Sequence, residues 1–478
     1  MPAHRRRSPW YVLPVALLTL MVGSFALAAQ AERAGSTPTP IAAGTATTPV
    51  LSARRVPTIL AAPIADQRLQ AQLQQLVDAS PGAMCVDVHA DGREIFQAGD
   101  TTPLVPASLE KLLTGTVALE VLGADTTLST VVRAAAKPHD GVVDGDLYLV
   151  GGGDPLLMSD AYFQHFEHPP PERTDPAKLA DAVVAAGVKQ INGRVVGDDS
   201  RYDNAYYPSA WPTRYATEAE SGPASALTLD QGLDAFPPTH DDKLPKEHPA
   251  DNPPQHAADL FAGLLAARGV TIAAPAVSGA APAGSADLAS LPSAPISGLV
   301  AEMLRESDNT TAELLTKEIG LHSGGGGSTA SGVAAIAAEA TTLGLPVDGS
   351  VQVDGSGLSD HDRTTCALVT ALLERTGPAG ALANGLPIAG QTGTLEKRFL
   401  DLPVVGRLRA KTGTLNQVTA LAGLLPTAKG AGVTFSYVLN IDPARRISLD
   451  DIGIQDGLVQ ILDSYPQGPD LSQLGPQA

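Results

Sequence analysis

The two ends of this chain carry matching patterns, and this match constrains the fold more than any other feature of the sequence. Near the start, apolar residues at helical spacing over residues 64–77 precede a hairpin pattern at residues 84–96 with an Asp-Gly turn. Near the end, a helical pattern at residues 450–462 follows three strand-like stretches, at 404–411, 419–425 and 433–441. We therefore expect both ends to build one antiparallel sheet, covered by helices from the middle of the chain. This is a mixed α/β (α+β) fold.

The stretch from residue 119 to residue 291 has a different character and indicates an insertion. It is rich in Pro and Asp and contains short strand-like runs, at residues 129–133, 145–150 and 194–196. The sheet-and-helix domain is therefore expected to be split by β-rich segments.

The N-terminus has the layout of a secretory signal. Arginines at residues 5–7 precede an apolar run at residues 10–29, which ends in a small-residue cleavage pattern. We expect residues 1–31 to be a signal peptide or a membrane anchor, because about 20 apolar residues can also span a bilayer. Residues 32–60, rich in Ser, Thr, Pro and Ala, are expected to be a flexible linker, and residues 466–478 a flexible tail. The protein is predicted to act outside the cytoplasm.

Composition excludes several classes of function. A hydrophobic fraction of 44% over 478 residues indicates a globular protein, and a net charge of −19 argues against nucleic-acid binding. Two cysteines are too few for a disulfide framework or for a thiolate metal cluster. A single bridge between Cys85 and Cys366 is one alternative, but two buried free thiols are what we expect. No metal or organic cofactor is required, and the sequence leaves the oligomeric state open.

Three short motifs occur in a fixed order and carry the chemistry. Ser-Leu-Glu-Lys at residues 108–111 opens an apolar helical run, Ser-Asp-Asn at 307–309 opens another helix, and Lys-Thr-Gly at 411–413 closes a strand. Each alone is weak evidence, because a serine and a lysine at a helix start are more often a cap and a solvated charge. Together and in this order they indicate a serine nucleophile with a lysine base.

Each motif residue has a predicted role. Ser108 and Lys111 share one helix face, so Lys111 can take the proton of the Ser108 hydroxyl if burial and a neighbouring cation, Lys411, lower its pKa. The helix N-terminus around Ser108 supplies N–H groups for an oxyanion. Ser307 is expected to relay a proton between the leaving amine and a lysine, and Asn309 to hold the peptide carbonyl of the substrate.

The last motif is expected to bind the end of the substrate. The hydroxyls of Thr412 and Thr414, together with Lys411, can grip a terminal carboxylate, and Gly413 belongs to the same predicted substrate-binding segment. The Thr414 N–H is expected to complete the oxyanion hole.

The motifs resemble those of the penicillin-recognising serine enzymes. Longer stretches resemble the low-molecular-mass class C penicillin-binding proteins, the type-4 D-alanyl-D-alanine carboxypeptidase/endopeptidase family, and these stretches are residues 106–114, 147–155, 197–203, 223–227, 354–359 and 386–390. The resemblance implies a cell-wall serine peptidase without a cofactor, which cleaves peptidoglycan stem peptides through a Ser108 acyl-enzyme and is acylated by β-lactams.

The resemblance also implies a domain arrangement. A β-lactamase/transpeptidase-like domain, with an antiparallel sheet between helices, would occupy residues 61–118 and 292–465. It would be interrupted by two nested β-rich domains, one at residues 119–140 and 209–291 and a second at residues 141–208.

A final implication concerns the side chain of diaminopimelate. In this family an acidic residue and an arginine are expected to meet its amino and carboxylate ends. Asp198 is the better match for the acid. Some relatives carry the arginine at the position where this chain has Asp360. Arg363 is therefore the residue expected to take the role of that arginine.

Two other functions compete with this hypothesis. A β-lactamase is disfavoured by the long insertion, and a non-catalytic wall-binding or β-lactam-sensing protein by the intact motif residues Ser108, Lys111, Ser307 and Lys411. The predicted partners are peptidoglycan stem peptides and β-lactams, with no nucleic acid and with a membrane only through the N-terminal segment.

Overall fold

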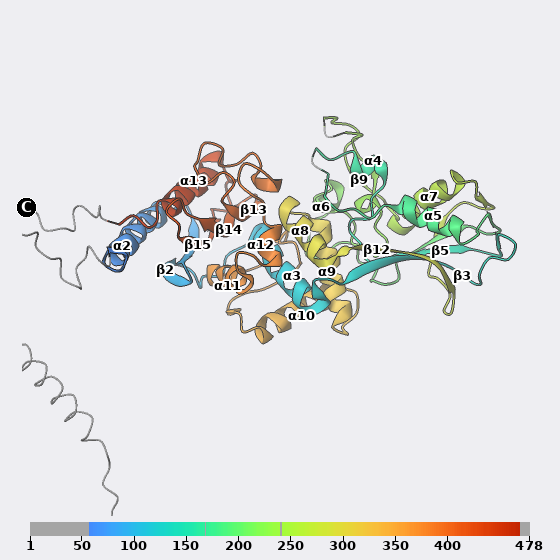
Figure 1. The fold of residues 1–478 in the computed structure, drawn as a ribbon, viewed down its shortest axis with the longest axis horizontal. Coiled ribbons are helices and arrows are strands. Elements are labelled where there is room, and N and C mark those ends of the chain that lie inside the picture. Colours follow the sequence, from blue (N-terminus) through green and yellow to red (C-terminus); the bar gives the residue numbers. More distant parts are fainter. Residues whose placement is uncertain (1–56, 168, 240, 469–478) are drawn as a thin grey trace, which may run out of the picture. The chain divides into compact units, whose positions relative to one another are not determined.

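The computed structural model describes residues 57–468, except 168 and 240 (Figure 1). The predictions for residues 1–31, for most of the linker and for most of the tail lie outside this part of the chain. The described residues from 61 to 468 belong to one compact unit. None of the helices within the described part combines the length and apolar character that a membrane crossing requires.

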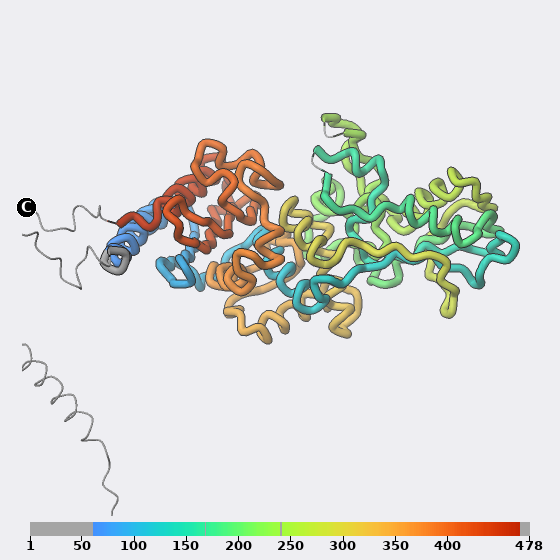
Figure 2. Tube along the Cα trace, viewed as in Figure 1, coloured from blue at the N-terminus to red at the C-terminus, as the bar shows by residue number. Residues whose placement is uncertain are grey.

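A five-stranded antiparallel sheet is built from both ends of the chain, as predicted. Its strand order is β13-β14-β15-β1-β2, and Figure 2 shows the blue N-terminal and red C-terminal segments side by side. The hairpin turns at Asp91 and Gly92, whose φ angles of 50° and 73° suit a tight two-residue turn. The strands are β1 (Ala83–Ala90), β2 (Arg93–Ala98), β13 (Arg409–Leu415), β14 (Val418–Pro426) and β15 (Gly432–Asn440).

Alternate residues of this sheet enter two hydrophobic cores on its opposite faces. On β14, Ala420 and Ala422 pack into a core that contains most of the helices from the middle of the chain, whereas Leu421 and Leu425 pack against the two terminal helices. The first core is covered by α3 (Glu110–Ala118), α8 (Ile296–Glu306), α9 (Asn309–His322), α10 (Thr329–Thr342), α11 (Cys366–Thr376) and α12 (Ala381–Gly385). The second is covered by α2 (Pro57–Asp78) and α13 (Leu449–Asp463).

Residue spacing and a capping motif in the sequence explain why the two terminal helices form. Leu69 and Leu73 lie one turn apart on α2 and are both buried in the second core. Helix α13 begins at a capping box, in which the Ser448 hydroxyl accepts from the Asp451 backbone and the Asp451 carboxylate accepts from the Ser448 backbone.

A second, mixed sheet comes entirely from the chain between the first two motifs. Its order is β11-β7-β5-β3-β12, and α5 (Pro176–Ala185) and α7 (Pro253–Ala266) share its core. Its strands are β3 (Thr127–Ala134), β5 (Leu147–Val150), β7 (Val195–Asp198), β11 (Val277–Ser278) and β12 (Ala286–Pro295). Shorter elements of this region are β4 (Val142–Val143), β6 (Gln190–Ile191), β8 (Leu233–Ala235), β9 (His248–Pro249), β10 (Thr271–Ile272), α4 (Asp160–Phe163) and α6 (Arg214–Thr217).

The strand predicted at residues 404–411 is misplaced. Strand β13 begins at Arg409, because the chain turns at residues 404–408, where the Val404 carbonyl accepts from the N–H groups of Arg407 and Leu408. The Lys-Thr-Gly motif therefore lies inside a strand and does not close one.

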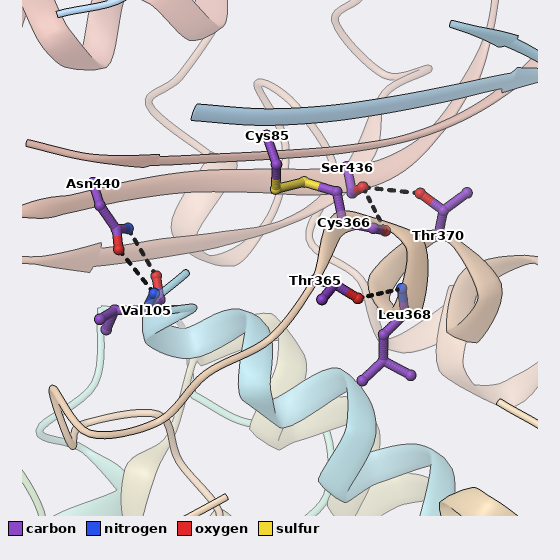
Figure 3. The surroundings of a disulfide bond; sticks show 8 residues. All are labelled: Cys85, Val105, Thr365, Cys366, Leu368, Thr370, Ser436 and Asn440. Carbon is purple, nitrogen blue, oxygen red and sulfur yellow. Dashed lines mark hydrogen bonds between the residues drawn. A yellow bond between two sulfur atoms is a disulfide. The ribbon is translucent and has the colours of Figure 1, made fainter. Parts of the chain in front are cut away.

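The expectation of two free thiols is wrong. Cys85 of β1 and Cys366 at the start of α11 form a disulfide, with their Cα atoms 6.0 Å apart (Figure 3). The first core brings these residues together although they are 281 positions apart in sequence. Beside the bridge, Ser436 donates its hydroxyl to the carbonyl of Cys366.

Candidate active site

Ser108 and Lys111 meet at the start of the first central helix. Ser108 lies in a 3₁₀ turn (Ala107–Leu109) that leads into α3, and Lys111 Nζ donates to Ser108 Oγ at 3.1 Å. Lys111 is fully buried, whereas Ser108 is half-buried at the edge of a cavity. The predicted nucleophile therefore reaches solvent while its base is withdrawn from it.

The segment that leads into Ser108 is held tightly. The Asn440 side chain pairs with both backbone groups of Val105, accepting from its N–H at 2.8 Å and donating to its carbonyl at 3.0 Å (Figure 3). Ala107 has a left-handed φ of 48°, which is uncommon for a residue with a Cβ and typical of functional sites. A Cβ on Gly413 would lie 2.9 Å from the Pro106 carbonyl oxygen, so this glycine lets β13 pass close to the turn.

The second motif lies beside the first at the same cavity. Ser307 ends α8 with a left-handed φ of 60°, and Asp308 caps α9 by accepting from the Thr311 N–H. Asn309 Oδ1 accepts from Lys111 Nζ at 2.6 Å, and its Nδ2 donates to the Glu220 carbonyl at 2.6 Å. Asn309 thus joins the central helices to a loop of the inserted chain.

Lys411 completes the group of motif residues. Its Nζ, carried by β13, donates to Ser307 Oγ at 2.8 Å and to the Thr412 carbonyl at 2.7 Å. The structure therefore brings the five motif residues together in two hydrogen-bonded groups, one of Ser108, Lys111 and Asn309 and the other of Ser307 and Lys411.

Burial increases the fraction of both lysines that is neutral near pH 7. Burial lowers the pKa of Lys111 to about 8, and the nearby carboxylates, Asp354 foremost, oppose this by favouring the ammonium form. The pKa of Lys411 is lowered well below its ordinary value, first by burial and then by repulsion from Lys111. A neutral amine beside a serine hydroxyl is the arrangement that general-base catalysis needs.

A cavity of about 430 Å³ opens above these residues. Ser108 and Thr414, whose N–H groups are predicted to bind the oxyanion, line it together with Ser307 and Asn309. The remaining lining residues are Arg214, Tyr215, Glu220, Leu358, Leu415, Asn416, Arg446, Ile447 and Ile452. The cavity is therefore polar, with charges of both signs at its rim.

Comparison with known proteins now identifies the family. Residues 65–243 and 238–463 match the model of the D-Ala-D-Ala carboxypeptidase 3 (S13) family. The chain belongs to this family. The assignment confirms the resemblance seen in the motifs.

Individual relatives agree with the S13 assignment. The carboxypeptidase DacB of Mycolicibacterium smegmatis is 31% identical over 94% of this chain and 97% of its own length. The D-alanyl-D-alanine carboxypeptidase of an Actinomadura species is 29% identical over 76% of this chain and 78% of its own. The crystal structure of penicillin binding protein 4 from Haemophilus influenzae has the same fold, with a TM-score of 0.69 at 22% identity over 82% of this chain and 99% of that one.

Two predicted binding residues of this S13 chain lie away from the cavity that holds Ser108. Asp198 lines a separate cavity of about 460 Å³ in the inserted region, and its carboxylate accepts from the N–H groups of Ser200 and Ala281. The Arg363 guanidinium donates to the backbone carbonyls of Asp360 and Asp362, both at 2.7 Å. Neither residue therefore lines the cavity that holds Ser108.

Thr412 and Thr414 differ in their surroundings. Thr414 lines the cavity, whereas the Thr412 hydroxyl donates to the hydroxyl of Thr394 at 3.0 Å. Thr394 belongs to the Gln-Thr-Gly-Thr stretch at residues 391–394. The contact shows that this stretch adjoins the Lys-Thr-Gly strand.

Sequence reasoning missed several residues around the site. Arg214 and Glu220 line the cavity from the inserted chain, and no local pattern marked them. Glu313 and Asp354 are buried and close enough to Lys111 to affect its pKa. The sequence marked Asp354 only as the first residue of a family-like stretch, and it gave no signal for Glu313. Within the described part of the chain, no group of three or more His, Cys, Asp or Glu side chains is arranged to hold a metal ion.

Proposed function

We propose that this chain acts on peptidoglycan stem peptides as an extracytoplasmic serine D-alanyl-D-alanine carboxypeptidase and endopeptidase, with Ser108 as its nucleophile. The observation that carries the proposal is the 3.1 Å hydrogen bond between Lys111 Nζ and Ser108 Oγ at the floor of a cavity shared with Ser307, Asn309 and Thr414. The apolar N-terminal segment after three arginines supports export.

Acylation follows from these contacts. Lys111 Nζ takes the hydroxyl proton as Ser108 Oγ attacks the carbonyl carbon of the D-alanyl-D-alanine bond, and the carbonyl oxygen becomes an oxyanion. The N–H groups of Ser108 and Thr414 stabilise that oxyanion. The oxyanion then collapses, the C–N bond breaks, and the leaving amine takes a proton through the Ser307 hydroxyl, which Lys411 contacts.

Hydrolysis restores the enzyme. Water, deprotonated by a neutral lysine of the site, attacks the acyl carbon of the Ser108 ester, and the ester C–O bond breaks. Ser108 regains its proton and the shortened peptide leaves as a carboxylate. A β-lactam follows the same first step, because its amide carbonyl offers the same electrophile, and its ring opening keeps the leaving amine tethered.

The charged rim of the cavity suits a zwitterionic side chain in the substrate. Arg214 and Arg446 supply positive charge and Glu220 negative charge within the cavity that holds Ser108. We assign to these groups, in place of Asp198 and Arg363, the binding of the carboxylate and amino ends of a diaminopimelate residue.

Ser108→Ala tests the proposed function directly. The variant should lose both covalent labelling by a fluorescent penicillin and release of D-alanine from a pentapeptide stem, while the wild type shows both. Ser436→Ala is the matched control, because it removes a buried serine hydroxyl from the core without touching the cavity. Labelling of the Ser108→Ala variant would overturn the assignment, and rapid turnover of a cephalosporin by the wild type would indicate a β-lactamase.

A further inference from the structure

A buried loop at residues 354–359 packs against the back of the catalytic helix. The Thr114 hydroxyl donates to the Gly355 carbonyl at 2.8 Å, and Lys111 Nζ donates to the Ser356 carbonyl at 2.7 Å. A Cβ on Gly357 would lie 2.0 Å from the Ala107 carbonyl oxygen, so the loop touches the residue before the nucleophile. The 354–359 loop thus contacts the helix on both sides of Ser108 and Lys111.

The loop supplies one of three acceptors around the Lys111 amine. An ammonium group has three N–H donors, and Nζ faces Ser108 Oγ, Asn309 Oδ1 and the Ser356 carbonyl oxygen. The first acceptor is the reacting hydroxyl itself. The other two therefore determine where the amine lies relative to that hydroxyl, and the Ser356 carbonyl can do so only if the loop holds its shape.

Two buried carboxylates hold that shape. Glu313 Oε1 accepts from the N–H groups of Gly355 and Ser356, at 3.0 and 2.9 Å. Asp354 Oδ1 accepts from Ser356 and Gly357, at 3.1 and 2.6 Å, and its Oδ2 accepts from the Trp211 indole at 2.6 Å. Both carboxylates bind N–H groups of the loop, which leaves the Ser356 carbonyl directed at Lys111.

Glu313 connects this loop to the second motif. It lies four residues after Asn309 on α9, so one helix face carries both the amide that accepts from Lys111 and the carboxylate that binds the loop. Glu313 is fully buried, and its second oxygen has no hydrogen-bond partner. A buried, half-satisfied carboxylate costs stability, so its retention needs a reason beyond packing.

We propose that Glu313 is a positioning residue for catalysis: it holds the 354–359 loop so that the Ser356 carbonyl fixes Lys111 Nζ against Ser108. The inference rests on the proposed roles of Ser108 and Lys111. Glu313 touches neither the substrate nor the reacting atoms and acts through the loop.

The proposal predicts a specific change in pH dependence. The charged groups that face Lys111 are Glu110 beside it, Asp308 and Glu313 at α9, Asp354 of the loop, and Lys411 of β13. Loss of the Ser356 acceptor destabilises the ammonium form of Lys111. Burial raises the pKa of Glu313 to about 8, so its side chain is largely neutral below that pH and its removal takes away little charge. The lost acceptor lowers the pKa of Lys111 further, so the acid limb of the rate profile should move to lower pH.

The experiment measures the second-order rate of Ser108 acylation by a fluorescent penicillin as a function of pH. The Glu313→Ala variant should be acylated about 10- to 100-fold more slowly than the wild type on the high-pH plateau of the rate profile, because the base is misplaced. The acid limb of its rate profile should move to lower pH. Glu313→Gln keeps an oxygen acceptor for the two loop N–H groups and should recover most of the rate. Glu318→Ala is the control on the same helix, since Glu318 binds Arg201 and Tyr202 and leaves the loop untouched.

The outcomes separate positioning from simple destabilisation. Two results with a folded Glu313→Ala protein would overturn the proposal. One is an acylation rate equal to that of the wild type, and the other is a lower rate with the acid limb of the pH profile unmoved. If Glu313→Ala does not fold, Thr114→Val carries the same prediction, because it removes the hydroxyl that holds Gly355. An unchanged profile in that variant would also count against it. Failure of the proposed function itself would appear separately, as labelling of the Ser108→Ala variant.

Discussion

Lys111 Nζ and Asn309 Oδ1 lie 2.6 Å apart, although 198 positions separate them in the sequence. The contact joins the helix that presents the nucleophile to the helix that begins at the second motif. Asn309 also donates to the carbonyl of Glu220, so the same amide reaches the inserted chain. One side chain therefore couples the predicted base, the second motif and the rim of the cavity.

The rate of Ser108 acylation should rise with pH through a midpoint near the Lys111 pKa of about 8. In the proposed mechanism the neutral amine is the base, so protonation below this pH removes it. One pH unit below the midpoint the rate should be about ten-fold lower than on the high-pH plateau. Lys111→Arg should be inactive at every pH, because a guanidinium keeps its proton. A midpoint at the ordinary lysine pKa, or a pH-dependent rate in Lys111→Arg, would contradict the assignment. Stopped-flow labelling with a fluorescent penicillin measures both.

Arg214→Ala should lower kcat/KM for a stem peptide that contains diaminopimelate by about 10-fold, because a charge-assisted hydrogen bond to its carboxylate is lost. A matched peptide with lysine at that position lacks this carboxylate and should be cleaved at an unchanged rate. Arg375→Ala, which removes a surface arginine paired with Glu120, is the control for charge alone. Equal losses for the two peptides would exclude a role in side-chain recognition, and chromatography of released D-alanine gives the rates.

Cys85→Ser/Cys366→Ser should lower the free energy of unfolding by about 2–4 kcal/mol. The bridge closes a loop between residues 281 positions apart, so it restricts the unfolded chain, and in the native state it joins β1 to α11. Denaturant unfolding of the wild type with and without reductant measures the loss, and the double variant should be insensitive to reductant. Two titratable thiols in the unreduced, denatured wild type would show that the bridge is absent.

The local placement of the motif side chains was predictable because their patterns are short-range, and their catalytic roles stay a prediction. A serine and a lysine three residues apart on a helix, and a serine two residues before an asparagine at a helix start, place side chains through local geometry alone. The antiparallel sheet from both chain ends was also predictable, since short apolar runs bounded by turn residues mark strands that are buried on both faces. The boundary of β13 was not, because residues 404–408 continue an apolar pattern while their backbone turns.

The sequence by itself determined the S13 family, the order of the motif residues and the sheet that both chain ends build. The boundaries of the two nested domains stay a prediction. Only the tertiary structure decided that Cys85 pairs with Cys366, that Arg214 and Glu220 reach the cavity in place of Asp198 and Arg363, and that the Ser356 carbonyl contacts Lys111. The physical reason is common to these cases. Each depends on how distant segments pack, and neither helical spacing nor strand alternation encodes a contact between residues that are far apart in the chain.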